Sequence, residues 1–240
     1  MPNRPFKIKN WKLATLALIF IIFFMSLGIW QLMRAHEKKM LLAAYTLRTR
    51  QIPFLATDLK KNIDLRFHRV KLTGIFDNQH NLLLDNKIFK GRVGYEIYTP
   101  FYVTGFEKPL LVDRGFIPMG KRRDIFPGIN AIVGNVTITG MLNVPPTYVA
   151  LGNMNDASSI AWPLRVEFIN LSQLKKVLNY SLFNYVVTLS PNDPAAYAIE
   201  WQVVMMGPEK HLGYAFQWFA FAATLLIIYL AVNTKKIDGN

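Results

Sequence analysis

The side chains best suited to chemistry in this 240-residue sequence are its four histidines, because it contains no cysteine. His211 differs from the others in lying just before an uncharged apolar run, with Tyr214, Trp218 and Ala222 following at spacings of three, four and four residues. On a helix these four residues form one stripe. A neutral imidazole can ligate a metal. It can equally hydrogen-bond to water or lipid headgroups at a membrane surface, so both interpretations stay open here.

No catalytic constellation is visible in the sequence. It has no glycine-rich phosphate-binding signature, no Gly-x-Ser-x-Gly elbow and no His-Glu-x-x-His zinc motif. Without cysteine, thiolate metal sites and cysteine nucleophiles are excluded. His68 and His80 are expected to be structural or solvated. Solvated carboxylates at strand ends or turns are expected for Asp77, Asp85, Glu96, Asp113 and Asp124. The sequence therefore predicts that this protein is not an enzyme.

Two uncharged apolar runs, residues 13–33 and 213–232, predict membrane-spanning helices. About 20 such residues are enough to cross roughly 30 Å of hydrocarbon. A cleaved signal peptide is disfavoured, because the first run is longer than usual and no small-x-small cleavage site follows it. Aromatic residues that favour headgroup depth lie near the ends of both runs: Trp11, Trp30, Tyr214, Trp218 and Tyr229.

The net charge of +13 is partly concentrated next to the apolar runs. Basic residues precede the first run and follow the second, which predicts that both termini are cytoplasmic. An anionic bilayer suits this charge, and no nucleic-acid-binding motif is present. No Arg- and Ser-rich presequence is visible, which favours a bacterial inner membrane. The predicted order is cytoplasmic residues 1–12, span 13–33, an extracytoplasmic domain 34–212, span 213–232 and a cytoplasmic tail 233–240.

Between the two runs the hydrophobic period changes from helical to two residues. Residues 34–50 are predicted to extend the first helix, and Asn170 is predicted to cap a helix over 171–178. Pro100 is expected to bend or end its strand, because proline cannot donate to a ladder. A mostly antiparallel α+β domain, a small barrel or a sandwich, is therefore predicted. The candidate strands are 70–73, 81–84, 95–103, 109–116, 136–139, 184–188 and 200–205.

Five local patterns occur in order along the chain. Leu-Gly-Ile-Trp-Gln-Leu-Met-Arg ends the first run at 27–34, and Val-Lys-Leu-Thr-Gly-Ile-Phe-Asp follows at 70–77. Gly-Tyr at 94–95 leads to Thr-Pro at 99–100, before Leu-Val-Asp-Arg-Gly-Phe-Ile-Pro at 111–118. His-Leu-Gly-Tyr at 211–214, with Trp218-Phe219, opens the second run. Together these patterns resemble the surfeit locus protein 1 family, although Glu209 stands where that family often has asparagine.

The resemblance implies a membrane-anchored assembly factor, or chaperone, for a haem-copper terminal oxidase (cytochrome c oxidase). It implies transient binding of haem A and help with its insertion into subunit I, with haem A synthase as a possible further partner. His211 would be the axial ligand of the haem iron, and Tyr214 and Trp218 would flank the macrocycle. Lys210 or Arg34 would pair with the propionates. A contact surface for the partner is implied at Trp30, Gln31 and Arg34.

Two other functions are compatible with the same architecture. A haem-free scaffold would use both spans and the domain to stabilise unfinished oxidase. A receptor-type sensor also has two spans around an outer domain, but the tail 233–240 is too short for a signalling output.

Overall fold

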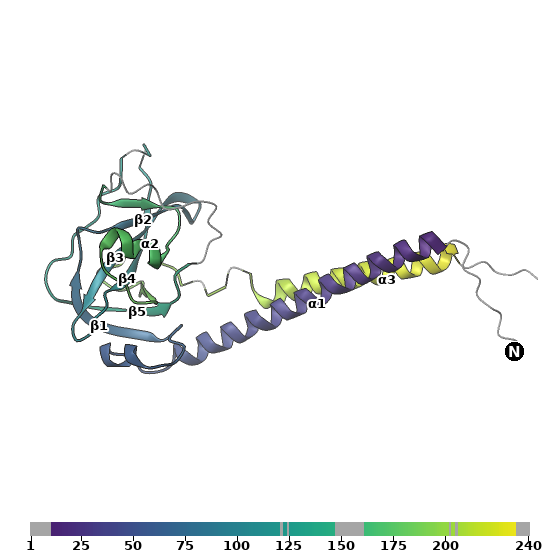
Figure 1. The fold of residues 1–240 in the computed structure, drawn as a ribbon, viewed down its shortest axis with the longest axis horizontal. Coiled ribbons are helices and arrows are strands. Elements are labelled where there is room, and N and C mark those ends of the chain that lie inside the picture. The colour runs from purple at the N-terminus through teal and green to yellow at the C-terminus, as the bar shows by residue number, and fades with distance from the viewer. Residues whose placement is uncertain are drawn as a thin grey trace, which may run out of the picture. The chain divides into compact units, whose positions relative to one another are not determined.

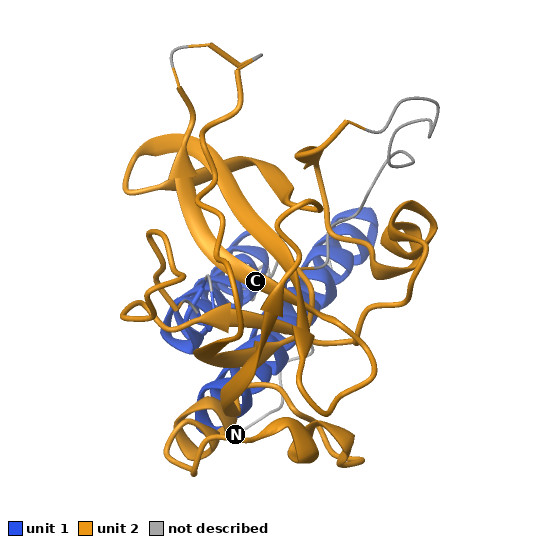
Figure 2. Cartoon of the chain, turned by 90° about the vertical axis from the view of Figure 1, so that its left-hand side faces the viewer, with its two compact units in different colours: residues 1–43, 202–240 blue, residues 44–201 orange. Residues whose placement is uncertain are grey.

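The computed structural model describes residues 11–120, 122–123, 125–146, 161–201, 203–204 and 206–233. The chain divides into two units, residues 1–43 with 202–240 and residues 44–201 (Figure 2). The first unit contains most of helix α1 (Trp11–Arg48) and helix α3 (Pro208–Asn233). The second contains a short 3₁₀ helix, Ala56–Lys60, helix α2 (Leu171–Leu178) and all the strands. The strands are β1 (Arg69–Phe76), β2 (Leu82–Phe89), β3 (Arg92–Val103), β4 (Leu110–Pro118), β5 (Val136–Asn143), β6 (Leu164–Val166) and β7 (Val186–Leu189).

Helices α1 and α3 are both long and apolar enough, by length and composition, to cross a membrane. They lie side by side and antiparallel (Figure 1). Helix α1 has 38 residues, because the helix-forming stretch after the apolar run carries it on to Arg48. The predicted extension of the first helix is confirmed to that residue.

The strands form a closed barrel. Their order is β1-β5-β7-β4-β3, and a further pairing between β1 and β3 closes the ring. Strand β2 continues the sheet from β3, and β6 pairs with β2. Only the β4–β7 and β2–β6 pairs among these described strands are parallel. The prediction of an α+β, mostly antiparallel domain is confirmed, and the barrel is the form it takes.

Buried and exposed residues alternate strictly along β1, whereas β4 is buried for most of its length. Val70, Leu72 and Phe76 are the large buried side chains of β1. They pack with Phe101 of β3 and Val112 of β4. A second cluster forms where α2 covers the sheet, with Leu174 and Leu178 against Leu82, Leu84 and Leu111. Asn170 caps α2 as predicted: its side-chain oxygen accepts from the backbone N–H groups of Ser172 and Gln173.

Pro100 does not end its strand, so that part of the prediction was wrong. The edge of β3 that faces β2 up to Tyr98 faces β1 from Phe101 onward. Pro100 lies where β3 changes its partner from β2 to β1. The N–H that proline lacks is therefore not needed for a ladder hydrogen bond. Its carbonyl still accepts from the Asp77 N–H at 2.9 Å.

The predicted strand at 200–205 is also absent from the described part of that segment. There the Trp201 indole N–H donates to the Leu189 carbonyl at 2.9 Å, so the chain crosses the end of β7 without joining the ladder. Strand β6 was not predicted, because three residues are too few to show a period.

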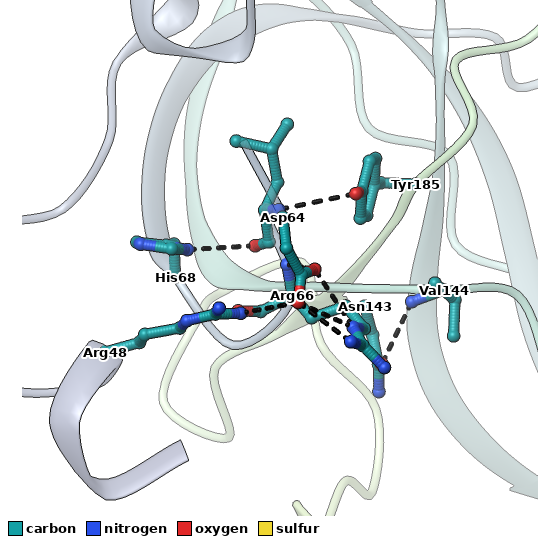
Figure 3. A network of polar contacts seen from close by, with 8 residues as sticks. Arg48, Asp64, Arg66, His68, Asn143, Val144 and Tyr185 are labelled. Carbon is teal, nitrogen blue, oxygen red and sulfur yellow. Dashed lines mark hydrogen bonds and ion pairs between the residues drawn. The ribbon is translucent and has the colours of Figure 1, made fainter. Parts of the chain in front are cut away.

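The end of α1 is joined to the barrel domain by an ion-pair network (Figure 3). Arg48 donates to Asp64 at 3.0 Å and to the Arg66 carbonyl at 2.9 Å. The Arg66 guanidinium donates to the same Asp64 carboxylate at 2.8 Å. These hydrogen bonds lower the pKa of Asp64 below its usual value. The network therefore stabilises the last turn of the helix as the chain enters the domain.

Candidate functional site

The helix pair packs through small residues at heptad-like spacing. Ala17, Gly28 and Ala35 are the buried residues of α1, and Ala215 and Ala222 are buried on α3. Small side chains let two apolar helices approach closely. At Gly28 the approach leaves no room for a side chain, since a Cβ there would lie 2.5 Å from the Phe219 ring.

Aromatic rings fill the same interface one helical turn away. Phe24 stacks on Trp218 with ring centres 5.8 Å apart, and Phe221 contacts both rings. The Trp218 indole is thus engaged in packing between the helices. Its predicted role beside a macrocycle stays a prediction.

His211 lies in the first turn of α3 and points toward α1. It is 9% exposed, and its Nδ1 lies 2.7 Å from the Gln31 Oε1 of α1. The structure thus joins a predicted ligand and a predicted partner-contact residue that are 180 positions apart in the chain. Because an amide oxygen can only accept, the hydrogen of this contact lies on Nδ1, and Nε2 is the ring nitrogen outside the contact.

The remaining predicted site residues point elsewhere. Tyr214 and Trp30 are 45% and 48% exposed, so Tyr214 does not share the buried face of His211. Arg34 pairs with Glu37 at 2.7 Å and lies 5.7 Å from the Trp30 ring centre. Lys210 is exposed. The predicted stripe is therefore split, with His211 and Ala222 facing α1 and Tyr214 facing outward.

The other three histidines provide a comparison. His36 is exposed. His68 is buried, with Nδ1 on the Leu65 carbonyl at 3.2 Å and its ring stacked on Phe54. The Nδ1 of His80 lies 2.6 Å from an Asp77 carboxylate oxygen, so its Nε2 is likewise the ring nitrogen outside the contact. His80 lies in the turn after β1, in the barrel domain. His80 is thus the natural control for His211.

The structure can be tested for fit to a haem group. A histidine that ligates haem iron through one nitrogen usually has its other N–H held by an acceptor, and Gln31 is placed to be that acceptor for His211. The interface behind it is filled by Phe24, Trp218 and Phe219. His211 thus fits as an iron ligand. The described part of the helix interface is packed with side chains and does not form a pocket for the porphyrin.

Charged residues inside the barrel domain were not expected. Asp85 and Asp113 are 7% and 6% exposed, so the prediction of solvated carboxylates was wrong for both. The Asp85 carboxylate is paired with Arg123 at 2.7 Å. Burial and the nearby Glu96 raise the pKa of Asp113 well above its usual value.

Arg114 is the most deeply buried charge, at 2% exposure. It is the unpaired residue of a bulge in β4, because Ile97 pairs with Gly115 and Tyr98 with Asp113. Its guanidinium donates to the carbonyls of Ala195 at 3.1 Å and Asn130 at 3.0 Å. The adjacent Asp-Arg-Gly within an apolar strand was a visible signal, since glycine is favoured at the positive φ that such a bulge requires, +99° here.

Comparisons with known proteins cover nearly the whole chain. The model of the SURF1 family matches residues 18–223. A SURF1-like protein of Rickettsia bellii is 30% identical over 223 residues, covering 88% of this chain and 87% of that protein. Surfeit locus protein 1 of Takifugu rubripes is 24% identical over 88% of this chain and 92% of its own length. The Homo sapiens protein of the same name is 23% identical over 89% of this chain and 75% of its own length.

Proposed function

Because this chain belongs to the SURF1 family, we propose that it is a membrane-anchored assembly factor for a haem-copper terminal oxidase. In this role it binds haem A through His211 and helps its insertion into subunit I. Membership of the family supports the role in oxidase assembly. The hydrogen bond of His211 to Gln31 supports the binding of haem A.

The membrane anchorage rests on α1 and α3. Both are long and apolar enough to span a bilayer, and basic residues lie beyond their outer ends. Basic residues next to a span favour the cytoplasm. The barrel domain and His211 would then lie on the periplasmic side of a bacterial inner membrane, an assignment that the bacterial relatives favour.

The single observation that carries the haem proposal is the 2.7 Å contact between His211 Nδ1 and Gln31 Oε1. It leaves Nε2 as the nitrogen that can ligate an iron, which haem A, once bound, would supply.

The chain's own contribution is to bind and orient rather than to catalyse. Buried small residues and the Phe24–Trp218 stack hold α1 and α3 together, so the His211 ring has a fixed backbone position. At the end of the helix interface that carries His211, the cations placed to meet carboxylate groups are Arg34 and Lys210. We expect no turnover of substrate by the isolated protein.

The test is the absorption spectrum of the full-length protein purified from cells that make haem A. His211→Gln should lose the haem band, because glutamine can keep a hydrogen bond to Gln31 but is a poor iron ligand. His80→Ala, which removes a histidine of the barrel domain whose Nδ1 is also hydrogen-bonded, should keep it. An unchanged band in His211→Gln, or a band lost only in His80→Ala, would overturn the ligand assignment.

A second candidate function is a haem-free scaffold for unfinished oxidase. The close packing of α1 against α3 favours it, because the Phe219 ring lies directly against Gly28 and Trp218 stacks on Phe24. Wild-type protein that stays colourless when haem A is abundant, yet co-purifies with subunit I, would select the scaffold.

A further inference from the structure

Gln31 is unlike the other polar residues of the first apolar run. The hydroxyl of Thr15 donates to the Trp11 carbonyl at 3.1 Å, and that of Ser26 donates to the Ile22 carbonyl at 2.8 Å. Both bonds stay within one helical turn of α1. The Gln31 side chain instead reaches across to His211 on α3. Its contact is therefore specific to the pairing of the two helices.

The chemistry of this contact sets the state of the imidazole. The amide oxygen of Gln31 has no proton to give, so the hydrogen at 2.7 Å belongs to His211 Nδ1. Of the two neutral tautomers of His211, only the one protonated at Nδ1 can donate to this oxygen. The hydrogen bond also fixes the ring plane, since Nδ1 must face the oxygen. Which nitrogen of a histidine can bind a metal is determined by the bond that the other one makes.

We propose that Gln31 is a positioning residue, which accepts the Nδ1–H of His211, fixes the plane of its ring and leaves Nε2 as the nitrogen that can bind an incoming metal centre. Gln31 touches neither the metal nor a substrate. The inference concerns the metal-free protein. It rests on the proposed function only for the identity of the metal centre, the haem A iron.

The proposal gives Gln31 a role that differs from the one implied by the family resemblance. A residue that contacted the oxidase would present its amide outward. Here the amide is half-buried and turned into the helix pair. Loss of an oriented acceptor typically costs 10–100-fold in metal affinity. Gln31→Leu should therefore weaken haem A binding by about that factor even though His211 is intact.

The first experiment reads the tautomer without any haem. Full-length protein labelled with nitrogen-15 histidine is placed in lipid nanodiscs, and the His211 ring signals are assigned by their loss in His211→Gln. We expect a protonated Nδ1 and an unprotonated Nε2. Gln31→Leu should lose this pattern, Gln31→Glu should keep the Nδ1 proton because a carboxylate also accepts, and Ser26→Ala should change nothing.

The second experiment titrates haem A into the wild-type protein and into Gln31→Leu, Gln31→Glu and Ser26→Ala. A weakened affinity in Gln31→Leu together with the altered tautomer supports both proposals. An altered tautomer in protein that never binds haem A keeps the positioning role and removes the haem function. A wild-type His211 protonated at Nε2, or a pattern unchanged in Gln31→Leu, overturns the positioning role whatever the haem result.

Discussion

The guanidinium carbon of Arg114 lies 4.9 Å from the centre of the Tyr197 ring, and the hydroxyl of that tyrosine accepts the Asn130 N–H at 2.8 Å. The Asn130 carbonyl in turn accepts from Arg114 at 3.0 Å. The buried cation thus joins β4 to two segments that belong to no strand. It does so with carbonyl oxygens and ring faces, and burial lowers the pKa of Arg114.

Replacing Arg114 should therefore unfold the domain more easily. Arg114→Met keeps much of the side-chain length but leaves the buried Ala195 carbonyl, and that of the exposed Asn130, without their donor. We expect a loss of about 1–3 kcal/mol in the free energy of unfolding, the cost of leaving one buried group unpaired. Denaturation of the full chain in detergent measures it. Arg92→Met, at an exposed position of β3, is the control and should change the midpoint little.

Asp113 predicts a pH dependence of stability. Its pKa is raised in the folded state by burial and by Glu96, so the folded chain holds this proton more tightly than the unfolded chain. The contribution of Asp113 is therefore favourable at low pH and is lost as pH rises from the unfolded value through the folded one. Asp113→Asn should remove this loss, whose slope is at most about 1.4 kcal/mol per pH unit. Unfolding of both proteins from acid to neutral pH tests it, and parallel curves would show that folding does not raise the pKa of Asp113.

Asp64 predicts a pH dependence of stability opposite to that of Asp113. Its pKa is lowered by hydrogen bonds from Arg66 and Arg48, so its stabilisation is present above the unfolded pKa and is lost as pH falls toward the folded one. Asp64→Asn should cost about 1 kcal/mol at neutral pH, because the carboxylate is partly exposed and its ion pairs are screened. The difference from wild type should vanish in acid. Glu107→Gln, at an exposed position, is the control for loss of one negative charge.

The close contact between Gly28 and Phe219 predicts that a substitution at one position can relieve a steric clash introduced at the other. Gly28→Ala would place a methyl group against the Phe219 ring, at a cost of about 1–3 kcal/mol for an overpacked contact. Phe219→Ala removes the ring, so the double variant should be less impaired than the sum of the two single variants. Thermal unfolding of the four proteins in detergent gives the coupling energy. Additive effects would mean that the two residues are not in contact.

Much of the barrel could be predicted from local pattern. Six of the seven candidate strands fall within or overlap β1–β5 and β7, because a strand with one buried face repeats every two residues. Helix α2 and its Asn170 cap follow from side chains within one turn. The errors occur where the outcome depends on distant partners. Pro100 is tolerated in mid-strand because its neighbour changes there from β2 to β1.

The order of residues alone determines two apolar helices, a β-rich domain between them and the motifs that resemble one family, since hydrophobic period and short motifs are properties of neighbouring residues. Closure of the barrel, burial of Asp113 and Arg114, and the pairing of Gln31 with His211 are decided only in three dimensions. Each depends on groups far apart in the chain, and no local pattern specifies which distant group will meet a given side chain.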